Sequence, residues 1–533
     1  MPLLDIIIAI PLFLKTVLSS IGPFILLLGL LIFIHELGHF LVARWCGVTV
    51  EVFSLGFGPK IFKYKRGETL YCISLLPLGG YVKMYGDSLI ETPPKSEQHR
   101  GFLYQNVPRK LAIAFGGPLM NLLFAFCVFY LLALMGLPAL LPETGDIKKN
   151  TKAWETGFRP GDKILSISNQ PISFWADVDR LIKKSPEQTL EFKVESKGME
   201  KTLSVPVATK NNSNIFEFRK EVGHIEGLTP LSAGTGVGVI SPETPAYKAG
   251  LRTFDQITHI NDREIKYWRD LESTLIQEQF PIHMKVKRTN LKGKEKNLSI
   301  VLSNKSTKDK TLKDFGLEEV ELYLYKVGPK TPAEKAGLKP GDRLIAINGT
   351  LLKEWEDVLK SVQSNTDLTL SYQRDGQKQE AFISPEEMFV EGNLKERRMI
   401  GIGSAANLTI AFPAESVKNF SVFSAAKYAG FQTVHGLKSM ALGLFHIIKG
   451  TVSPRNLSGP VAIGRIAYKF FHTGFYQFLS MMALISLSLF FFNILPIPLL
   501  DGGHILFFTL EGIMGRPLDV KKLLAAQQAG LVL

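Results

Sequence analysis

Three long stretches of the chain are almost free of charged side chains. Residues 21–43 hold a single formal charge, and residues 111–142 and 478–500 hold none. A helix of 23 residues reaches about 35 Å at a rise of roughly 1.5 Å per residue, and the hydrocarbon core of a bilayer is about 30 Å thick. The pattern therefore predicts three membrane-spanning helices. A fourth is predicted within residues 422–448, which are apolar but carry two lysines.

Proline and glycine mark two places where these helices are expected to break. Gly22-Pro23 lies at the start of the first stretch, and proline removes a helix hydrogen bond, so we expect an interruption there. Pro496 and Pro498 lie at the end of the last stretch. Non-helical backbone at membrane depth is tolerated only where it is buried in protein or lines a cavity. The break therefore predicts a cavity that receives the carboxylate of Asp501.

The segment between the first two helices, residues 47–107, has the pattern of a small sheet. Short β-forming runs alternate with glycines that suit turns. The predicted strands are residues 48–53, 60–64, 69–75 and 80–84. Basic residues dominate this segment near the predicted helix ends, and the positive-inside rule then places it on the cytosolic side.

The hydrophilic block that follows repeats a motif three times. The marker glycines of the motif, Gly157, Gly250 and Gly337, end short helices and are 93 and 87 residues apart. Units of about 85–90 residues have the size of a small domain. The first and third copies continue with a Pro-Gly-Asp turn, whereas Phe254 stands where the second copy should have its turn glycine. We therefore expect the turn of the second copy to differ.

The composition gives no sign of a nucleic-acid partner, a disulfide framework or a signal peptide. The net charge is +13, but no basic patch interleaved with aromatic residues argues for nucleic acid. The three cysteines, Cys46, Cys72 and Cys127, all lie outside residues 143–420, so no disulfide framework is predicted there. The N-terminus has no basic segment ahead of its apolar run, so no cleavable signal peptide is predicted.

His35, Glu36 and His39 form an H-E-x-x-H motif inside the first apolar stretch. On a helix the two histidines lie one turn apart on the same face and can bind one metal ion, while Glu36 can take a proton from the attacking water. The motif is short enough to occur by chance. Within a spanning helix, however, a central charge costs about 2.5–3.5 kcal/mol on insertion scales, so such groups are rarely structural filler. These features predict a metalloprotease that works inside or at the edge of a bilayer.

Asn121 is a polar residue inside the uncharged second stretch. One interpretation is that its side chain makes a hydrogen bond between helices. The other is that it helps to shape the active site. The sequence leaves both interpretations open.

The order of the motifs resembles the site-2 proteases. The first span carries H-E-x-x-H, residues 493–502 read N-x-x-P-x-x-x-x-D-G, and the three repeats resemble PDZ domains of bacterial proteases. The resemblance covers nearly the whole chain and is greatest to the bacterial group that cleaves membrane-embedded anti-sigma factors. That group usually has two PDZ units rather than three. It also continues with a short apolar stretch where this chain ends at residues 530–533, which leaves open whether the C-terminus is truncated.

The resemblance implies a Zn²⁺ ion held by His35, His39 and Asp501. It implies that Glu36 acts as general base and then as the acid that protonates the leaving amine. Asn493 would hydrogen-bond the substrate backbone, and a strand would pair with an unwound substrate helix. The residues of that strand are Gly80, Tyr81, Val82, Lys83 and Met84.

The implied function is hydrolysis of a peptide bond within the transmembrane segment of single-span substrates, namely a trimmed anti-sigma factor and possible remnant signal peptides. The implied location is the bacterial inner membrane, with a multi-pass topology. The PDZ-like domains would lie on the periplasmic side and the active site toward the cytosol. The lipid bilayer is a further expected partner. The sequence leaves open whether the PDZ grooves bind peptide termini or only screen substrates by size.

The predicted fold class is a polytopic α-helical membrane protein with about four transmembrane helices, a small membrane-associated β-sheet region and inserted α+β PDZ-like domains. The predicted parts are residues 1–46 (N-terminal segment and first helix), 47–107 (β-rich region), 108–142 (second helix), 143–232, 233–318 and 319–405 (PDZ-like domains), 406–450 (linker and third helix), 451–477 (amphipathic segment) and 478–533 (fourth segment and C-terminal tail).

Two other classes of protein remain open. A non-catalytic membrane scaffold that binds peptides through its PDZ-like units would need no zinc and would tolerate His35→Ala. A transporter is the second alternative, because buried charges and broken helices also mark ion pathways. The chain lacks the two-fold repeat of broken spans that transporters often show, and the placement of H-E-x-x-H and D-G on different spans favours the protease.

Overall fold

The computed structural model shows two compact units. It describes residues 2–88, 93–145, 147, 149–212, 221–230, 235–265, 268–289, 295–303, 311–388, 397–405, 416–450 and 459–516. The first unit, called the helical unit below, is built from residues 1–137 and 418–533. The second, called the repeat unit, lies within residues 138–417.

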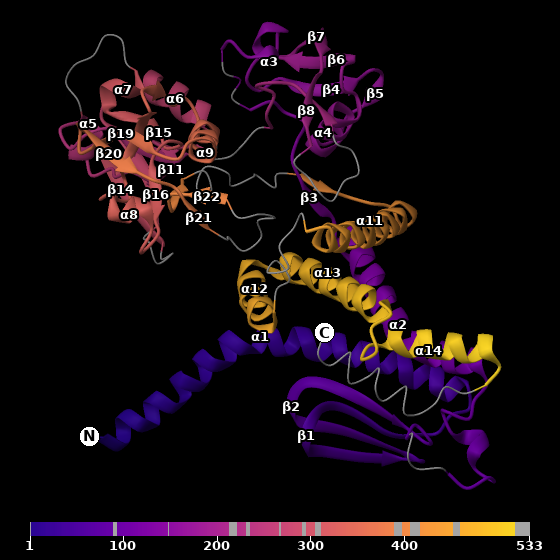
Figure 1. The fold of residues 1–533 in the computed structure, drawn as a ribbon. Coiled ribbons are helices and arrows are strands. Elements are labelled where there is room, and N and C mark those ends of the chain that lie inside the picture. The colour runs from indigo at the N-terminus through magenta and orange to yellow at the C-terminus, as the bar shows by residue number, and fades with distance from the viewer. Residues whose placement is uncertain are drawn as a thin grey trace. The chain divides into compact units, whose positions relative to one another are not determined.

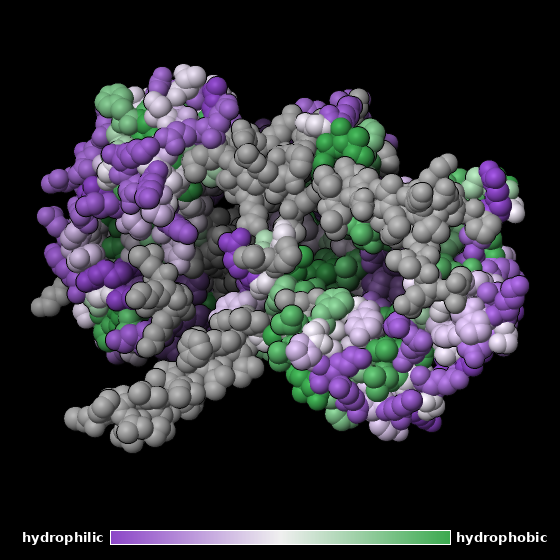
Figure 2. Space-filling model, turned by 60° about the horizontal axis from the view of Figure 1, so that its bottom comes forward, coloured by the Kyte–Doolittle hydropathy of each residue, from purple (hydrophilic) through white to green (hydrophobic). Residues whose placement is uncertain are grey.

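Among the described residues of the helical unit, three helices are long and apolar enough to cross a membrane. They lie within α1 (Pro2–Trp45), α2 (Val107–Met135) and α13 (Phe475–Ile494). Figure 2 shows hydrophobic surface over this unit. Exposed leucines on α1 and α2 include Leu26, Leu41, Leu123, Leu131 and Leu134. An apolar exterior of this kind suits contact with lipid rather than with water.

Helix α1 continues without a break through Gly22 and Pro23, so the interruption predicted there is wrong. Proline does remove one helical hydrogen bond. Inside a bilayer, however, no water is present to satisfy an opened backbone, and each unsatisfied group costs several kcal/mol. Continuing the helix with one bond missing therefore costs less than opening it.

Helix α11 (Val422–Ile448) occupies the fourth predicted stretch. Its 27 residues would reach about 40 Å. Among the described helices it is not one of those that meet the length and hydropathy criteria for a span, which agrees with the lysines in its sequence. The spanning helix predicted within residues 422–448 stays a prediction. Helix α12 (Pro460–Thr473) lies in the segment predicted to be amphipathic, of which residues 451–458 are outside the described residues.

Helix α2 is the centre of the helical unit. It packs against α1, α11, α13 and α14 (Asp501–Met514), as Figure 1 shows. The apolar core of this packing is formed by Ala125, Val128, Phe129, Leu132, Ala429, Ala483 and Leu487. Where α1 meets α2, a Cβ atom added to Gly38 would lie 2.1 Å from the carbonyl oxygen of Gly116. Small residues at this crossing let the two backbones touch.

The last apolar stretch is broken, as its prolines predict. Helix α13 ends at Ile494 and α14 begins at Asp501, so the backbone around Pro496 and Pro498 is non-helical. The continuation as a second helix, α14, was not predicted from the sequence. The predicted tail beyond residue 516, including residues 530–533, lies outside the described residues.

Strands β1 (Val50–Arg66) and β2 (Thr69–Met84) form the small sheet. Three of the four predicted segments lie within them, and the first, residues 48–53, begins two residues before β1. The start of β1 pairs with two parts of β2, because Val52 is opposite both Leu70 and Lys83. Residues 80–84 therefore pair with β1 along one side, and β2 also packs against α1 (Figure 1). The short 3-10 helix η1 (Gln98–Arg100) follows before α2.

The repeat unit builds the same sheet three times. The first repeat contains α3 (Lys152–Glu155), β4 (Lys163–Ile167), β5 (Gln170–Pro171), α4 (Trp175–Lys184), β6 (Thr189–Ser196), β7 (Met199–Pro206), β8 (Ala208–Asn211) and β9 (Glu221–His224). The second contains β10 (Val237–Val239), α5 (Pro245–Lys248), β11 (Gln256–Ile260), β12 (Arg263–Glu264), α6 (Trp268–Gln277), β13 (Ile282–Thr289), β14 (Glu295–Leu302), α7 (Leu312–Phe315) and β15 (Leu317–Glu319). The third contains β16 (Leu324–Val327), α8 (Pro332–Lys335), β17 (Arg343–Ile347), β18 (Thr350–Leu351), α9 (Trp355–Ser364), β19 (Leu368–Arg374), β20 (Gln377–Ile383), β21 (Glu386–Met388), β22 (Arg397–Met399) and β23 (Ile402–Ser404). Strands β3 (Leu137–Ala139) and β24 (Ser416–Lys418) lie where the chain passes between the units.

The strand order is the same in all three repeats. The sheets run β5-β4-β6-β7, β12-β11-β13-β14 and β18-β17-β19-β20. Each repeat also buries the aspartate of its turn in an ion pair with a basic residue from a later strand. These pairs are Asp162–Lys201 (2.9 Å), Asp255–Arg288 (2.6 Å) and Asp342–Arg374 (2.6 Å). The same carboxylate accepts a backbone N–H from three residues earlier, which pins the turn.

The turn of the second repeat does not differ from the others, so that prediction is wrong. Phe254 has a φ of +77°, beside +81° for Gly161 and +95° for Gly341. A bulky residue with positive φ is strained. Its ring packs edge-on against Tyr325 of the third repeat, with the ring centres 5.2 Å apart. This contact between repeats offsets the strain.

Candidate metal centre

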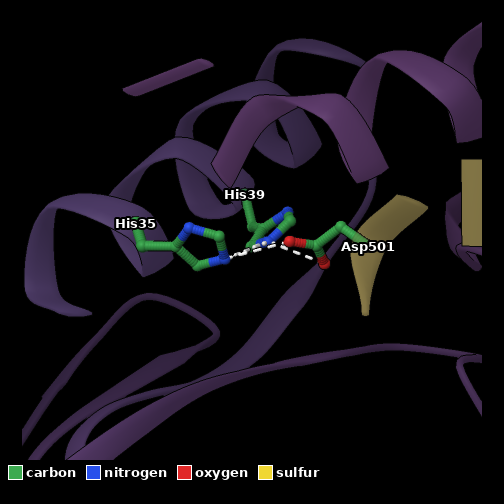
Figure 3. A group of neighbouring side chains, drawn as sticks. All are labelled: His35, His39 and Asp501. Atoms are coloured by element: carbon green, nitrogen blue, oxygen red, sulfur yellow. Dashed lines mark hydrogen bonds and ion pairs between the residues drawn. The ribbon is translucent and has the colours of Figure 1, made fainter. Parts of the chain in front are cut away.

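Two histidines of α1 and one aspartate of α14 point toward one another (Figure 3). Nε2 of His35 lies 3.1 Å from Oδ2 of Asp501, and Nε2 of His39 lies 3.4 Å from Oδ1 of the same carboxylate. The two Nε2 atoms are 3.3 Å apart. Side chains separated by more than 460 positions in the sequence thus converge on one point.

The spacing of the two imidazole nitrogens and the two carboxylate oxygens suits a tetrahedral zinc ion. With bonds of about 2.0–2.1 Å, tetrahedral geometry places neighbouring ligand atoms about 3.3–3.4 Å apart. The distances here are 3.1, 3.3 and 3.4 Å. Two imidazoles and one carboxylate are a donor set of catalytic zinc sites, which keep a fourth position open. In the described part of the chain, no other group of side chains is arranged to hold a metal ion.

Helix α2 contacts the outer nitrogen of each ring. Nδ1 of His39 lies 2.8 Å from the carbonyl oxygen of Ile113. An N–H at Nδ1 donates to that oxygen and leaves the lone pair on Nε2, where a metal would bind. On the other ring, Nδ2 of Asn121 lies 3.1 Å from Nδ1 of His35. The sequence left two interpretations of Asn121 open, a hydrogen bond between helices and a role at the active site. The contact with His35 joins α2 to α1 at the site, so both interpretations apply.

Glycine at position 117 leaves room for the two rings. A Cβ atom there would lie 2.3 Å from Nε2 of His39 and 2.8 Å from Nε2 of His35. Both distances are far inside van der Waals contact, so a side chain at this position would occupy the space between the ligand atoms. Sequence reasoning did not assign Gly117 to the site. The signal that could have found it is the pair of small residues, Gly116 and Gly117, inside a span, because such pairs mark close helix crossings.

A tight turn delivers Asp501 to the histidines. A Cβ atom on Gly502 would lie 2.3 Å from the carbonyl oxygen of Ile494, and one on Gly503 would lie 2.4 Å from that of Ile497. The start of α14 therefore packs directly against the non-helical backbone that precedes it. Asp501 is the first residue of α14, and a carboxylate is favoured in the first turn of a helix by the positive end of its dipole.

Glu36 lies beside the three candidate ligands on α1. Its carboxyl group is close enough to interact electrostatically with all three, and the backbone N–H of Val82 hydrogen-bonds to it. A Cβ atom on Gly80 would lie 3.1 Å from Cγ of Glu36. The edge of the sheet formed by residues 80–82 therefore borders the predicted general base.

The other residues predicted to bind substrate lie in the last turn of α13 and on β2. Asn493 is half-buried in the last turn of α13. The ring of Tyr81 stacks on Phe57, with centres 6.1 Å apart, and Lys83 forms an ion pair of 2.8 Å with Glu51. The role of these side chains in substrate binding stays a prediction.

A buried ion pair joins α14 to α2. Nζ of Lys110 lies 2.5 Å from Oε1 of Glu511, and the two side chains are 4% and 17% exposed. The same ammonium lies 5.2 Å from the ring centre of Phe508, also on α14. The two charged residues are 401 positions apart, so no local sequence pattern could have paired them. The pair fixes the helix that carries Asp501.

Lys110→Met is expected to destabilise the protein by about 3–5 kcal/mol, because it leaves the carboxylate of Glu511 buried without its cation. The double variant Lys110→Met/Glu511→Leu should recover most of that loss, since an apolar pair can replace a buried ion pair. Unfolding of the detergent-solubilised protein in denaturant measures both. Lys183→Met is the control, because its pair with Asp179 is half exposed and should contribute about 0–1 kcal/mol. Equal losses for Lys110→Met and Lys183→Met would contradict the assignment.

Comparison with known proteins gives matches over almost the whole chain. The family model for peptidase family M50 matches residues 23–533. A Vibrio cholerae protein named as a zinc metalloprotease is 29% identical over 513 residues, which cover 95% of this chain and 93% of that protein. Protease RseP of Yersinia pestis is 28% identical, covering 95% and 93%. The regulator of sigma-E protease RseP of Escherichia coli is 29% identical, covering 94% and 92%.

One similar solved structure matches a part of the chain. A PDZ domain of an SdrC-like protein from Listeria monocytogenes covers 17% of this chain and 96% of its own length, at 20% identity and a TM-score of 0.15. The family match, by contrast, includes both the helix with H-E-x-x-H and the turn with Asp501. The chain therefore belongs to peptidase family M50 and is a zinc metalloprotease of the site-2 class.

Proposed function

We propose that this enzyme hydrolyses a peptide bond inside the transmembrane segment of single-span substrates, with zinc held by His35, His39 and Asp501. One observation carries the proposal. The Nε2 atoms of His35 and His39 on α1 lie 3.3 Å apart, and each lies 3.1–3.4 Å from one carboxylate oxygen of Asp501 on α14. This cluster lies within a unit whose long helices are apolar enough to cross a membrane. A peptide bond that reaches these atoms must be at or within the membrane.

The residues around the metal centre have distinct tasks in peptide hydrolysis. Zinc, when bound, supplies a Lewis acid that polarises the scissile carbonyl and makes water more acidic. Glu36 takes the proton of the attacking water and then gives a proton to the leaving amine. The hydrogen bond from the backbone of Val82 holds the Glu36 carboxylate in place before substrate arrives. Ile113 and Asn121 hold the outer nitrogens of the two imidazoles.

The sheet edge beside Glu36 offers a way to open a helical substrate. A peptide bond inside a helix is shielded, and it must be extended before water can attack it. An extended segment can add to the edge of a sheet through main-chain hydrogen bonds. Residues 80–84 pair with β1 along one side, and Gly80 adjoins Glu36. We assign substrate pairing to this strand and backbone binding to Asn493, one residue before the helix break.

The substrates we propose are a trimmed anti-sigma factor and remnant signal peptides. The name of the E. coli relative, regulator of sigma-E protease, supports the first of these. We place the enzyme in the bacterial inner membrane, with the active site toward the cytosol and the PDZ-like repeats on the periplasmic side. Basic residues between the first two spans support this orientation. Peptide termini are the proposed ligands of the repeats.

Metal analysis combined with a cleavage assay tests the proposal. The purified wild-type protein should carry about one zinc per chain, as a site with three protein ligands does, and should cleave a single-span substrate in detergent or vesicles. Asp501→Ala should lose both properties. A matched control is Asp375→Ala, an exposed carboxylate of the repeat unit, which should keep both. Zinc-free wild-type protein that still acts on its partner would instead favour a peptide-binding scaffold.

A further inference from the structure

Asn121 has a fully buried side chain in α2, and its amide contacts the ring of His35. The side chain is 0% exposed. Its Nδ2 atom lies 3.1 Å from Nδ1 of His35, and its backbone oxygen accepts a hydrogen bond of 2.8 Å from Ser486 on α13. The Oδ1 atom is buried and finds no hydrogen-bond partner in the described part of the chain.

A buried amide with an unsatisfied oxygen is costly, and an apolar side chain of similar volume would avoid that cost. Along α2, Ala125 of the apolar helix core follows Asn121 by one turn. Its one side-chain partner among the described residues is the ring of His35. The amide is therefore to be explained by what it does for that ring.

The two nitrogens of a neutral imidazole have opposite needs. If Nε2 binds a metal, its lone pair is used and the ring's single N–H is at Nδ1, which then requires an acceptor. His39 has such an acceptor in the carbonyl oxygen of Ile113, which cannot change its role. His35 faces an amide, which presents a donor or an acceptor according to how it is turned.

The contact of 3.1 Å between the Asn121 amide and His35 fits two positions of the ring proton. With Nδ2 of Asn121 donating to Nδ1 of His35, the ring proton is at Nε2, which lies 3.1 Å from Oδ2 of Asp501 and can donate to it. A half turn of the amide exchanges its two outer atoms and brings Oδ1 to Nδ1. The ring then keeps one proton, now at Nδ1, and Nε2 is free to bind.

We infer that Asn121 is a positioning residue of the metal centre, whose amide oxygen accepts the Nδ1 proton of His35 and so directs the Nε2 lone pair to the metal. The inference rests on the proposed zinc site. The amide oxygen then does for His35 what the carbonyl oxygen of Ile113 does for His39.

Zinc affinity of three variants tests the inference without using activity. Competition with a chromophoric chelator gives the zinc dissociation constant of each purified full-length protein. Asn121→Leu removes the acceptor and should weaken zinc binding about 10–100-fold, as loss of such an outer partner does. Asn121→Asp keeps an acceptor at the same distance and should bind zinc within about 10-fold of wild type. Asn121→Ala serves as a second acceptor-free variant if the leucine does not fit, and melting curves establish which variants are folded.

Ser486→Ala is the matched control, because it removes the neighbouring hydrogen bond to the Asn121 backbone and leaves the amide in place. It should change the zinc dissociation constant less than about 2-fold, far below the effect of losing the acceptor. Two results would overturn the inference: folded acceptor-free variants that bind zinc as tightly as wild type, or Asn121→Asp binding as weakly as Asn121→Leu. Failure of the wild-type protein to bind zinc would instead refute the zinc site itself.

Discussion

Glu36→Gln is expected to abolish peptide cleavage while the protein keeps its zinc. The amide has the size of the carboxylate but cannot accept the proton of the attacking water, and general acid–base groups contribute about 10²–10⁴-fold to a rate. The three ligand atoms come from other side chains, so the metal should stay bound. Single-turnover cleavage of a single-span substrate measures the loss, and zinc content measured on the same sample checks the site.

The control for this variant is Glu68→Gln, which removes an exposed carboxylate of the same unit that pairs with Arg100. It should leave both cleavage and zinc content at wild-type levels, because an exposed pair contributes about 0–1 kcal/mol. A Glu36→Gln protein that cleaves at the wild-type rate would refute the role of Glu36. Loss of zinc together with activity would show that Glu36 supports the metal site rather than the proton transfer.

The two histidine ligands and the general base could be predicted from the sequence, because they lie within five consecutive positions. His35 and His39 are four positions apart, so any helix places them on one face. Two prolines before Asp501 predicted a break, and the structure has the break between Ile494 and Asp501. Asp501 was predicted as the third ligand only from the resemblance to a family, because no spacing rule connects residues on different helices.

The parts that the sequence did not reveal depend on contacts between distant elements. Lys110 and Glu511 meet because α14 lies along α2, and the carbonyl of Ile113 faces His39 because α1 crosses α2. The continuous helix through Pro23 and the unchanged turn at Phe254 were predicted wrongly. In both cases a local preference of the residue was overridden by its surroundings, a buried setting without water for Pro23 and a neighbouring ring for Phe254.

Gly117→Ala is expected to destroy the metal site although alanine is the better helix former. The added methyl carbon would lie 2.3 Å from Nε2 of His39 and 2.8 Å from Nε2 of His35. The ring of His39 is held by its bond to Ile113 and cannot move away without losing it. A misplacement of about 1 Å can cost 10²-fold in rate, so cleavage should fall at least about 100-fold and zinc should be lost.

The same substitution at Gly29 separates this steric effect from a general one. Position 29 is also helical, and a Cβ atom there meets nothing within 4 Å. Alanine should stabilise a helix interior by about 0.5–1 kcal/mol relative to glycine. Gly29→Ala should therefore keep zinc and activity and melt no earlier than wild type. The contradicting result would be a Gly117→Ala protein that keeps zinc and activity as Gly29→Ala does. That result would mean that the two imidazoles are farther apart than in this structure. They would then be too far apart to bind one metal ion.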